Sequence, residues 1–109
     1  MSRYRVRYSR RADQDVVQIL DWYQKRSPQG AGRWLDALEQ AQNRLRENPL
    51  SYPLAEESDA FQEPIRRILF RTRRGNTYRA LFVVRANEVT ILGVRGPGQP
   101  PVSPEDLRA

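Results

Sequence analysis

Two residue types are missing from this chain, and their absence excludes several kinds of chemistry. The 109 residues include no cysteine and no histidine. Without cysteine there are no disulfides, thiolate nucleophiles or cysteine-ligated metals. Without histidine there is no Ser-His or Cys-His nucleophile pair, and no side chain has an unperturbed pKa near neutrality. We therefore expect no metal site of the familiar zinc or haem kind and no cofactor.

Lysine is nearly absent, so arginine carries almost all of the positive charge. Lys25 is the only lysine among 19 basic residues, and the net charge is +6. Because the guanidinium group is planar and always protonated, it binds phosphate or carboxylate groups bidentately. Such a surface suits a nucleic acid or an acidic protein segment. A general preference for arginine over lysine explains part of this composition, but it does not explain why the arginines cluster.

Long hydrophobic runs are also absent. No run approaches the length of a membrane span, and no apolar segment follows the charged N-terminus. We therefore expect a cytoplasmic protein without membrane contact. A chain of 109 residues, 39% of them hydrophobic, is large enough for one core. We expect residues 1–99 to form a single domain and the proline-rich residues 100–109 to form a tail.

The densest positive charge lies between Arg66 and Arg85, where seven arginines occur without any aspartate or glutamate. This region and the residues after it contain three apolar runs, at residues 65–70, 78–84 and 89–94. Short joins between the runs predict three antiparallel strands. Such a sheet would gather the arginines on one small surface that must meet solvent, counterions or an anionic partner.

The residues before this sheet predict a strand and two helices. Apolar residues alternate with arginines over residues 4–8, which indicates a strand that pairs with a later one. Ser9 is predicted to cap a first helix, and Ser27-Pro28 is predicted to start a second helix that stops at Asn48-Pro49. The two helices should form a hairpin that packs on the sheet. The predicted fold is α+β, a single domain of order β-α-α-β-β-β.

Several polar and aromatic residues have a simple structural interpretation. The proline-rich acidic segment 49–64 is expected to be an irregular connection that either covers part of the basic sheet or is a solvated loop. The acids of the first helix are expected on its surface; they are Asp13, Asp15 and Asp21. The aromatic residues of the helices are expected to pack the hairpin rather than to stack on bases; they are Trp22, Tyr23 and Trp34.

The order of these elements resembles the RelE/ParE family of toxins from bacterial type II toxin–antitoxin systems. Four segments carry the resemblance: YRVRYSRRADQDVVQILDWY, AGRWLDALEQAQNRLRENP, TYRALF, and the last strand from Val89 to Arg95. The combination extends from residue 4 to about residue 99. The resemblance implies a growth-inhibiting toxin that forms a hetero-oligomer with a small acidic antitoxin, which hides the basic surface.

The resemblance leaves three functions open. ParE-like members poison DNA gyrase, RelE-like members are ribosome-dependent mRNA endoribonucleases, and a third possibility is a non-toxic interaction module for nucleic acid or protein. Cleavage by a ribose 2′-OH needs a proton acceptor, a proton donor and a charge clamp. RelE-like sites use lysines and a late tyrosine for the protons, whereas this chain has no lysine after residue 25 and no tyrosine after Tyr78. This favours the ParE-like function.

The candidate site residues come from the basic sheet. If the protein is RelE-like, the resemblance makes Arg71, Arg73, Arg79 and Arg95 the candidate catalytic residues. Contacts with a target or an antitoxin are predicted for Arg66, Arg67, Arg71, Arg73, Arg74, Tyr78, Arg79, Arg85 and Arg95. For Arg79 the alternative is an ion pair with Glu88 or with an acid of residues 56–63. For Tyr78 the alternative is core packing, because the apolar residues of its strand share its parity.

Overall fold

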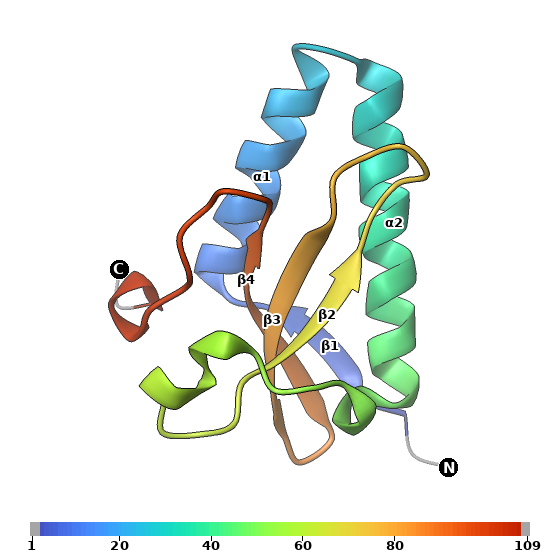
Figure 1. Cartoon of the computed structure of the whole chain (residues 1–109). Helices are drawn as coiled ribbons and strands as arrows, with labels where there is room; N and C mark the ends of the chain where they lie inside the picture. Colours follow the sequence, from blue (N-terminus) through green and yellow to red (C-terminus); the bar gives the residue numbers. More distant parts are fainter. Residues whose placement is uncertain (1–2, 108–109) are drawn as a thin grey trace.

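The computed structural model describes residues 3–107 of the chain. In this part the main elements are β1 (Arg5–Tyr8), α1 (Arg10–Gln24), α2 (Pro28–Glu47), β2 (Arg66–Phe70), β3 (Tyr78–Arg85) and β4 (Glu88–Arg95) (Figure 1). Short 3-10 helices are η1 (Pro49–Ser51), η2 (Glu56–Ala60) and η3 (Pro104–Leu107). This order confirms the predicted β-α-α-β-β-β arrangement of an α+β protein.

The strands form one mixed sheet in the order β1-β4-β3-β2. β3 is antiparallel to both β2 and β4, as the short joins predicted. β1 pairs with β4 in parallel, with Val6 opposite Val89. The register between β3 and β4 shifts after Leu81, so that Leu92 has no residue opposite it. The prediction that the N-terminal strand pairs with a later strand is therefore confirmed.

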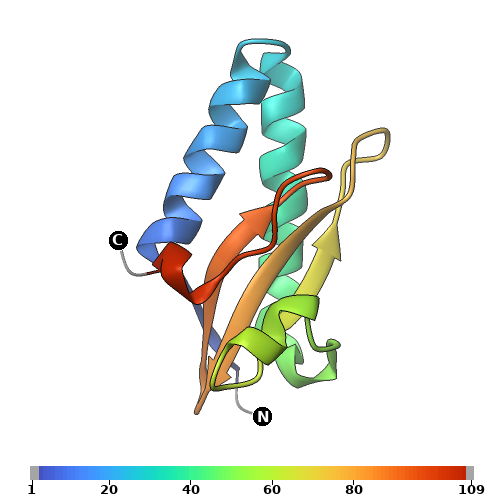
Figure 2. The same ribbon diagram turned by 60° about the vertical axis from the view of Figure 1, so that its left-hand side comes forward.

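Side-chain caps explain where both helices begin. Ser9 Oγ accepts a hydrogen bond from the Ala12 N–H, and Ser27 Oγ accepts one from the Gly30 N–H. Pro28 lies at the start of α2, where its missing N–H leaves no helical carbonyl unpaired. Both predicted helix starts are confirmed, and α1 and α2 form an antiparallel hairpin (Figure 2).

The helix hairpin covers one face of the sheet (Figure 2). The side chains between the two layers include Trp34, Leu45, Ile68, Phe82 and Ile91, all less than 2% exposed. Burying one large apolar side chain contributes about 1.5–3 kcal/mol. The hairpin and the sheet therefore depend on each other for their stability.

Irregular chain, rather than helix, covers part of the opposite face. Ala55 in the acidic segment and Val102 in the C-terminal tail pack with Leu81, Val83 and Leu92 of the sheet. The Ala55 N–H donates to the Ile65 carbonyl at 2.8 Å, which ties the acidic segment to the start of β2. Of the two expectations for residues 49–64, the structure confirms the covering of the sheet.

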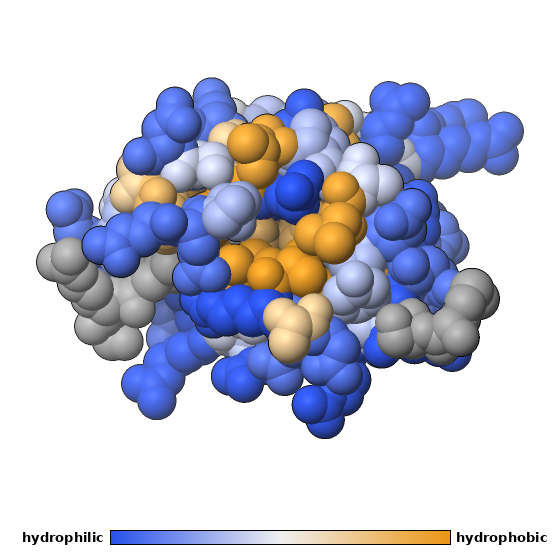
Figure 3. All heavy atoms as spheres, turned by 90° about the horizontal axis from the view of Figure 1, so that it is seen from below, coloured by the Kyte–Doolittle hydropathy of each residue, from blue (hydrophilic) through white to orange (hydrophobic). Residues whose placement is uncertain are grey.

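The face of the molecule that carries the β3–β4 turn is mainly hydrophilic (Figure 3). The end that carries the β3–β4 turn has a small group of hydrophobic side chains in its middle, with hydrophilic side chains around them (Figure 3). Within residues 3–107, neither helix combines the length and the apolar character that crossing a membrane requires.

Candidate functional site

Six of the eight arginines predicted to contact a target or an antitoxin fall into two groups. Arg79, Arg85 and Arg95 form ion pairs with acids of the same chain. Arg71, Arg73 and Arg74, in and before the β2–β3 turn, are exposed and take part in no ion pair within the described residues. The stretch from Arg66 to Arg85 contains no acids of its own, but acids that are distant in sequence thus neutralise part of its positive charge.

Arg79 lies against the acidic segment that crosses the sheet. Its guanidinium donates to Glu57 Oε2 at 2.8 Å and to Glu56 Oε1 at 3.4 Å. The Glu57 side chain is 1% exposed, and its Oε2 also accepts a hydrogen bond from the Val102 N–H at 3.1 Å. The alternative interpretation of Arg79, an ion pair with an acid of residues 56–63, is confirmed. Glu57 therefore links β3, η2 and the C-terminal tail.

Arg95 lies at the end of β4, beside α1. Its guanidinium donates to Asp15 Oδ2 at 3.0 Å and to the Pro100 carbonyl at 3.1 Å. The other Asp15 oxygen accepts a hydrogen bond from Arg11 at 3.2 Å. The side chains of Asp15 and Arg95 are only 5% and 4% exposed. A candidate for catalysis or binding is thus buried in an internal ion pair.

The prediction that Asp15 lies on the helix surface is wrong. Asp15 Oδ2 accepts a hydrogen bond from the Val94 N–H at 2.9 Å. The reason is the length of β1, whose pairing with β4 ends where Tyr8 lies opposite Ile91. Beyond that point the edge of β4 needs other partners, and Asp15 on α1 supplies one.

Two further candidates hold the chain together near the acidic segment. Arg66 donates to the Tyr52 carbonyl at 2.7 Å. Arg85 donates two hydrogen bonds to Glu63, at 2.9 and 2.6 Å, and this contact lowers the pKa of the Glu63 carboxyl. Both partners of the second pair are substantially exposed, so the pair contributes little to stability. The backbone N–H of half-buried Arg67 donates to the Pro53 carbonyl.

Tyr78 belongs to the core, as the parity of its strand indicated. It is 8% exposed and packs against Trp34 and Phe70. Its hydroxyl lies 3.4 Å from that of Tyr23. Burial, and then the hydrogen bond with Tyr23, raise the pKa of Tyr78 well above its ordinary value. The hydroxyl therefore stays protonated at neutral pH.

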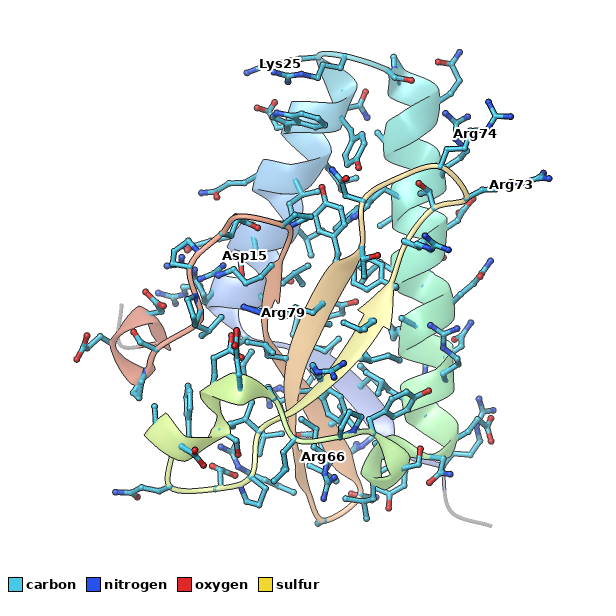
Figure 4. The ribbon with its side chains drawn as sticks, in the orientation of Figure 1. Asp15, Lys25, Arg66, Arg73, Arg74 and Arg79 are labelled. Atoms are coloured by element: carbon cyan, nitrogen blue, oxygen red, sulfur yellow. The ribbon has the colours of Figure 1, made fainter. Side chains whose placement is uncertain are left out.

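Exposed arginines of the β2–β3 turn meet two arginines that the sequence reasoning did not select. Arg73 and Arg74 extend outward from the turn, beside the upper part of α2 (Figure 4). Arg26 and Arg33 line the same cleft from the helix hairpin. The sequence could have indicated them, because Arg26 and Arg33 lie on either side of the predicted turn at Ser27-Pro28. A helix hairpin brings such positions close together.

Trp22 corrects a prediction about the aromatic residues. Trp34 is fully buried in the hairpin, as expected, but Trp22 is 48% exposed. The Arg26 guanidinium carbon lies 4.1 Å from the centroid of a Trp22 ring, and the ring contacts Tyr23 edge to face. Trp22 thus lines the cleft that also holds Arg26, Arg33, Arg73 and Arg74, which we call the arginine cleft.

Comparison with families of known proteins agrees with this fold. Residues 6–99 match the family model described as the ParE toxin of the type II toxin–antitoxin system parDE. The chain belongs to the ParE toxin family. It is thus the toxin component of a type II toxin–antitoxin system, a ParE-like one, as the sequence resemblance implied.

A solved structure from the chromosomal ParDE toxin–antitoxin system of P. aeruginosa is similar to this ParE-family toxin. The TM-score is 0.65 and the sequence identity is 19%, and the similarity covers 85% of this chain and 95% of the other. At this level of identity, the likeness concerns the fold. The search of curated proteins gave no significant match.

Among residues 3–107 of this ParE-family toxin, no cluster of three or more acidic side chains is arranged to hold a metal ion. The β2–β3 turn and the hairpin end present exposed arginines that form no ion pair within residues 3–107, whereas Arg79 and Arg95 are paired with buried carboxylates. The chemistry available at this surface is the binding of anions.

Proposed function

We propose that this ParE-family toxin acts in the cytoplasm by poisoning DNA gyrase, and that a small acidic antitoxin neutralises it. One observation supports the choice of gyrase over mRNA cleavage: two of the four candidate catalytic arginines are engaged in ion pairs within the fold. Arg79 and Arg95 are held by Glu57 and Asp15. Because each guanidinium is hydrogen-bonded to a buried carboxylate, it is not free to bind the phosphate of an RNA substrate.

Proton transfer is the second requirement that this chain does not meet. Tyr78 is the last tyrosine, and its hydroxyl is buried with a raised pKa. Arginine does not deprotonate in proteins because its pKa exceeds about 12. Within residues 3–107, the cleft at the β2–β3 turn is lined by no aspartate, glutamate or lysine that could transfer protons beside its exposed arginines. These facts support a toxin that inhibits by binding.

An acidic antitoxin fits the charge that the fold leaves free. The structural relative belongs to a ParDE toxin–antitoxin system. In this chain Arg71, Arg73 and Arg74 are exposed and form no ion pair within residues 3–107. We propose these three arginines as antitoxin or target contacts, and Arg67, near the start of β2, as a further one.

The function is tested by comparing two target assays with one toxin preparation. Expression of the chain alone should stop bacterial growth, and co-expression of an adjacent small acidic reading frame should restore it. Purified toxin should inhibit supercoiling by DNA gyrase and leave cleaved DNA after denaturation of the enzyme. Primer extension on translating mRNA should show no cuts phased with the ribosomal A site.

Each result separates one function from the others. Phased mRNA cuts that disappear in Arg79→Ala would assign the RelE-like activity instead. Normal growth at confirmed expression of folded protein would indicate an interaction module without toxicity. Growth arrest with unaffected gyrase and intact mRNA would overturn both assigned targets.

A further inference from the structure

A cleft of about 590 Å³ lies between the turn of the helix hairpin and the β2–β3 turn. Its charged and aromatic lining comes from three separate segments and consists of Trp22, Tyr23, Arg26, Arg33, Arg73 and Arg74. Within the described part of the chain, no acidic side chain lines this arginine cleft. The gathering of four arginines around one hollow is a tertiary feature, because Arg26 and Arg73 are far apart in sequence.

The charge of the arginine cleft is not neutralised by the protein. None of its four arginines forms an ion pair within residues 3–107. A cleft lined by one sign of charge concentrates ions of the opposite sign. Guanidinium groups on separate walls can each hold a different phosphate oxygen pair, so a chain of phosphates suits the cleft better than one small anion.

An exposed aromatic ring stands between this cleft and a second one. Trp22, nearly half exposed, also lines a neighbouring cleft of about 290 Å³. Three side-chain amides line that second cleft, from Gln18, Asn76 and Gln99. Amides both donate and accept hydrogen bonds, as the polar edges of unpaired bases require. The arginine cleft is thus adjacent to a ring and to amides that suit a base.

We propose that the arginine cleft binds single-stranded nucleic acid, with phosphates on its arginines and a base on Trp22. Proteins of this kind combine a positive groove with aromatic rings on which bases stack. A duplex keeps its bases paired and stacked inside, so it would use the arginines alone. An acidic peptide would likewise use the charge and leave the ring and the amides without a role. The proposal goes beyond the toxin function, since it requires neither gyrase nor antitoxin.

The test measures binding of fluorescent oligonucleotides to the full-length purified chain by anisotropy. The probes are oligo-dT and oligo-rU of about twelve nucleotides and a DNA duplex of the same length. Arg73→Ala with Arg74→Ala removes two charges from an exposed turn, which leaves the core intact. The matched control is Arg5→Ala with Arg44→Ala, which removes two exposed arginines outside the cleft. Trp22→Leu removes the ring but keeps an apolar side chain.

We expect the single strands to bind more tightly than the duplex. The turn variant should lose roughly tenfold in affinity at about 50 mM salt and should show a shallower salt dependence, whereas the control should change by less than about threefold. Trp22→Leu should weaken single-strand binding roughly tenfold and leave duplex binding unchanged. Tighter binding of oligo-dT than of oligo-rU would identify DNA as the source of the phosphates, and the reverse order would identify RNA.

Three results would overturn the proposal. Equal losses in the turn variant and the control would mean that only net charge matters. Duplex binding as tight as single-strand binding, with no effect of Trp22→Leu, would show that no base stacks on Trp22. Binding of a labelled polyglutamate peptide, abolished by the turn variant, together with no oligonucleotide binding would assign the cleft to an acidic protein segment.

Discussion

Asp15 and Arg95 form a buried ion pair across 80 positions of the chain, with Asp15 Oδ2 3.0 Å from the Arg95 guanidinium. The same carboxylate oxygen accepts the Val94 N–H, so one acid completes both the backbone and the side chain at the end of β4. The pair fastens the helix hairpin to the last strand at the point where β1 no longer pairs with it. Its role is therefore structural.

Replacing Asp15 should destabilise the fold strongly. Asp15→Ala leaves the buried Arg95 guanidinium without its closest carboxylate and the Val94 N–H without its acceptor, which costs about 3–5 kcal/mol. Urea unfolding followed by far-UV circular dichroism measures the loss. The control is Asp36→Ala, because Asp36 is an exposed helical acid. Equal effects of the two substitutions would contradict the structural role of Asp15.

Arg79 and Glu57 should be energetically coupled. Glu57→Gln and Arg79→Gln should each destabilise the protein. Arg79→Gln leaves the buried Glu57 carboxylate without its cation, and Glu57→Gln leaves Arg79 with only the more distant and exposed Glu56. The double variant should lose less than the sum of the two, with a coupling of about 0.5–3 kcal/mol. A double-mutant cycle of urea unfolding measures this value. Strictly additive losses would show that the contact at 2.8 Å carries no energy.

Two glycines should respond in opposite ways to the same substitution. A Cβ at Gly96 would lie 2.8 Å from the buried Tyr78 ring, so Gly96→Ala should lower stability by about 1–3 kcal/mol. At Gly32, an exposed position of α2, a Cβ would meet nothing within 4 Å. Gly32→Ala should therefore raise stability by about 0.5–1 kcal/mol. Thermal unfolding of both variants checks the two signs, and a gain from Gly96→Ala would be inconsistent with the packing around Tyr78.

The β3–β4 turn contains a strained alanine. Ala86 has φ of 54°, a left-handed conformation that glycine adopts more easily. Ala86→Gly should therefore stabilise the protein by up to about 1 kcal/mol. Gln40→Gly in the exposed part of α2 is the opposite control and should destabilise by about 1 kcal/mol. A fall in the melting temperature of Ala86→Gly would argue against strain at this turn.

The antitoxin footprint should include the exposed arginines of the β2–β3 turn. Simultaneous replacement of Arg71, Arg73 and Arg74 by alanine should weaken antitoxin binding at least tenfold, and more at low salt, because exposed charges are screened by ions. Titration calorimetry of the toxin variant with the antitoxin measures the change. The triple variant should keep the melting temperature of the unaltered chain, since these side chains make no ion pair within residues 3–107. Unchanged affinity would show that the antitoxin binds another part of the toxin surface.

Local rules were enough to predict the elements of this toxin. Capping by Ser9 and Ser27 and the alternation in β3 depend on residues close in the chain, so the helix starts and the core position of Tyr78 followed from the sequence. The order of the elements then indicated the toxin family, which the family model confirms. The bulge at Leu92 could not be predicted in this way, because it depends on the register of β3 against β4.

The availability of each arginine was decided only by the tertiary structure. Arg79 finds its acid 22 positions away and Arg95 finds its acid 80 positions away, whereas Arg26 and Arg73 meet at one cleft and remain unpaired. A charge is neutralised by groups within a few ångströms, and the fold alone determines which groups come that close. The sequence thus determined how much positive charge this toxin carries, and the packing of distant segments determined which part of it is free to bind.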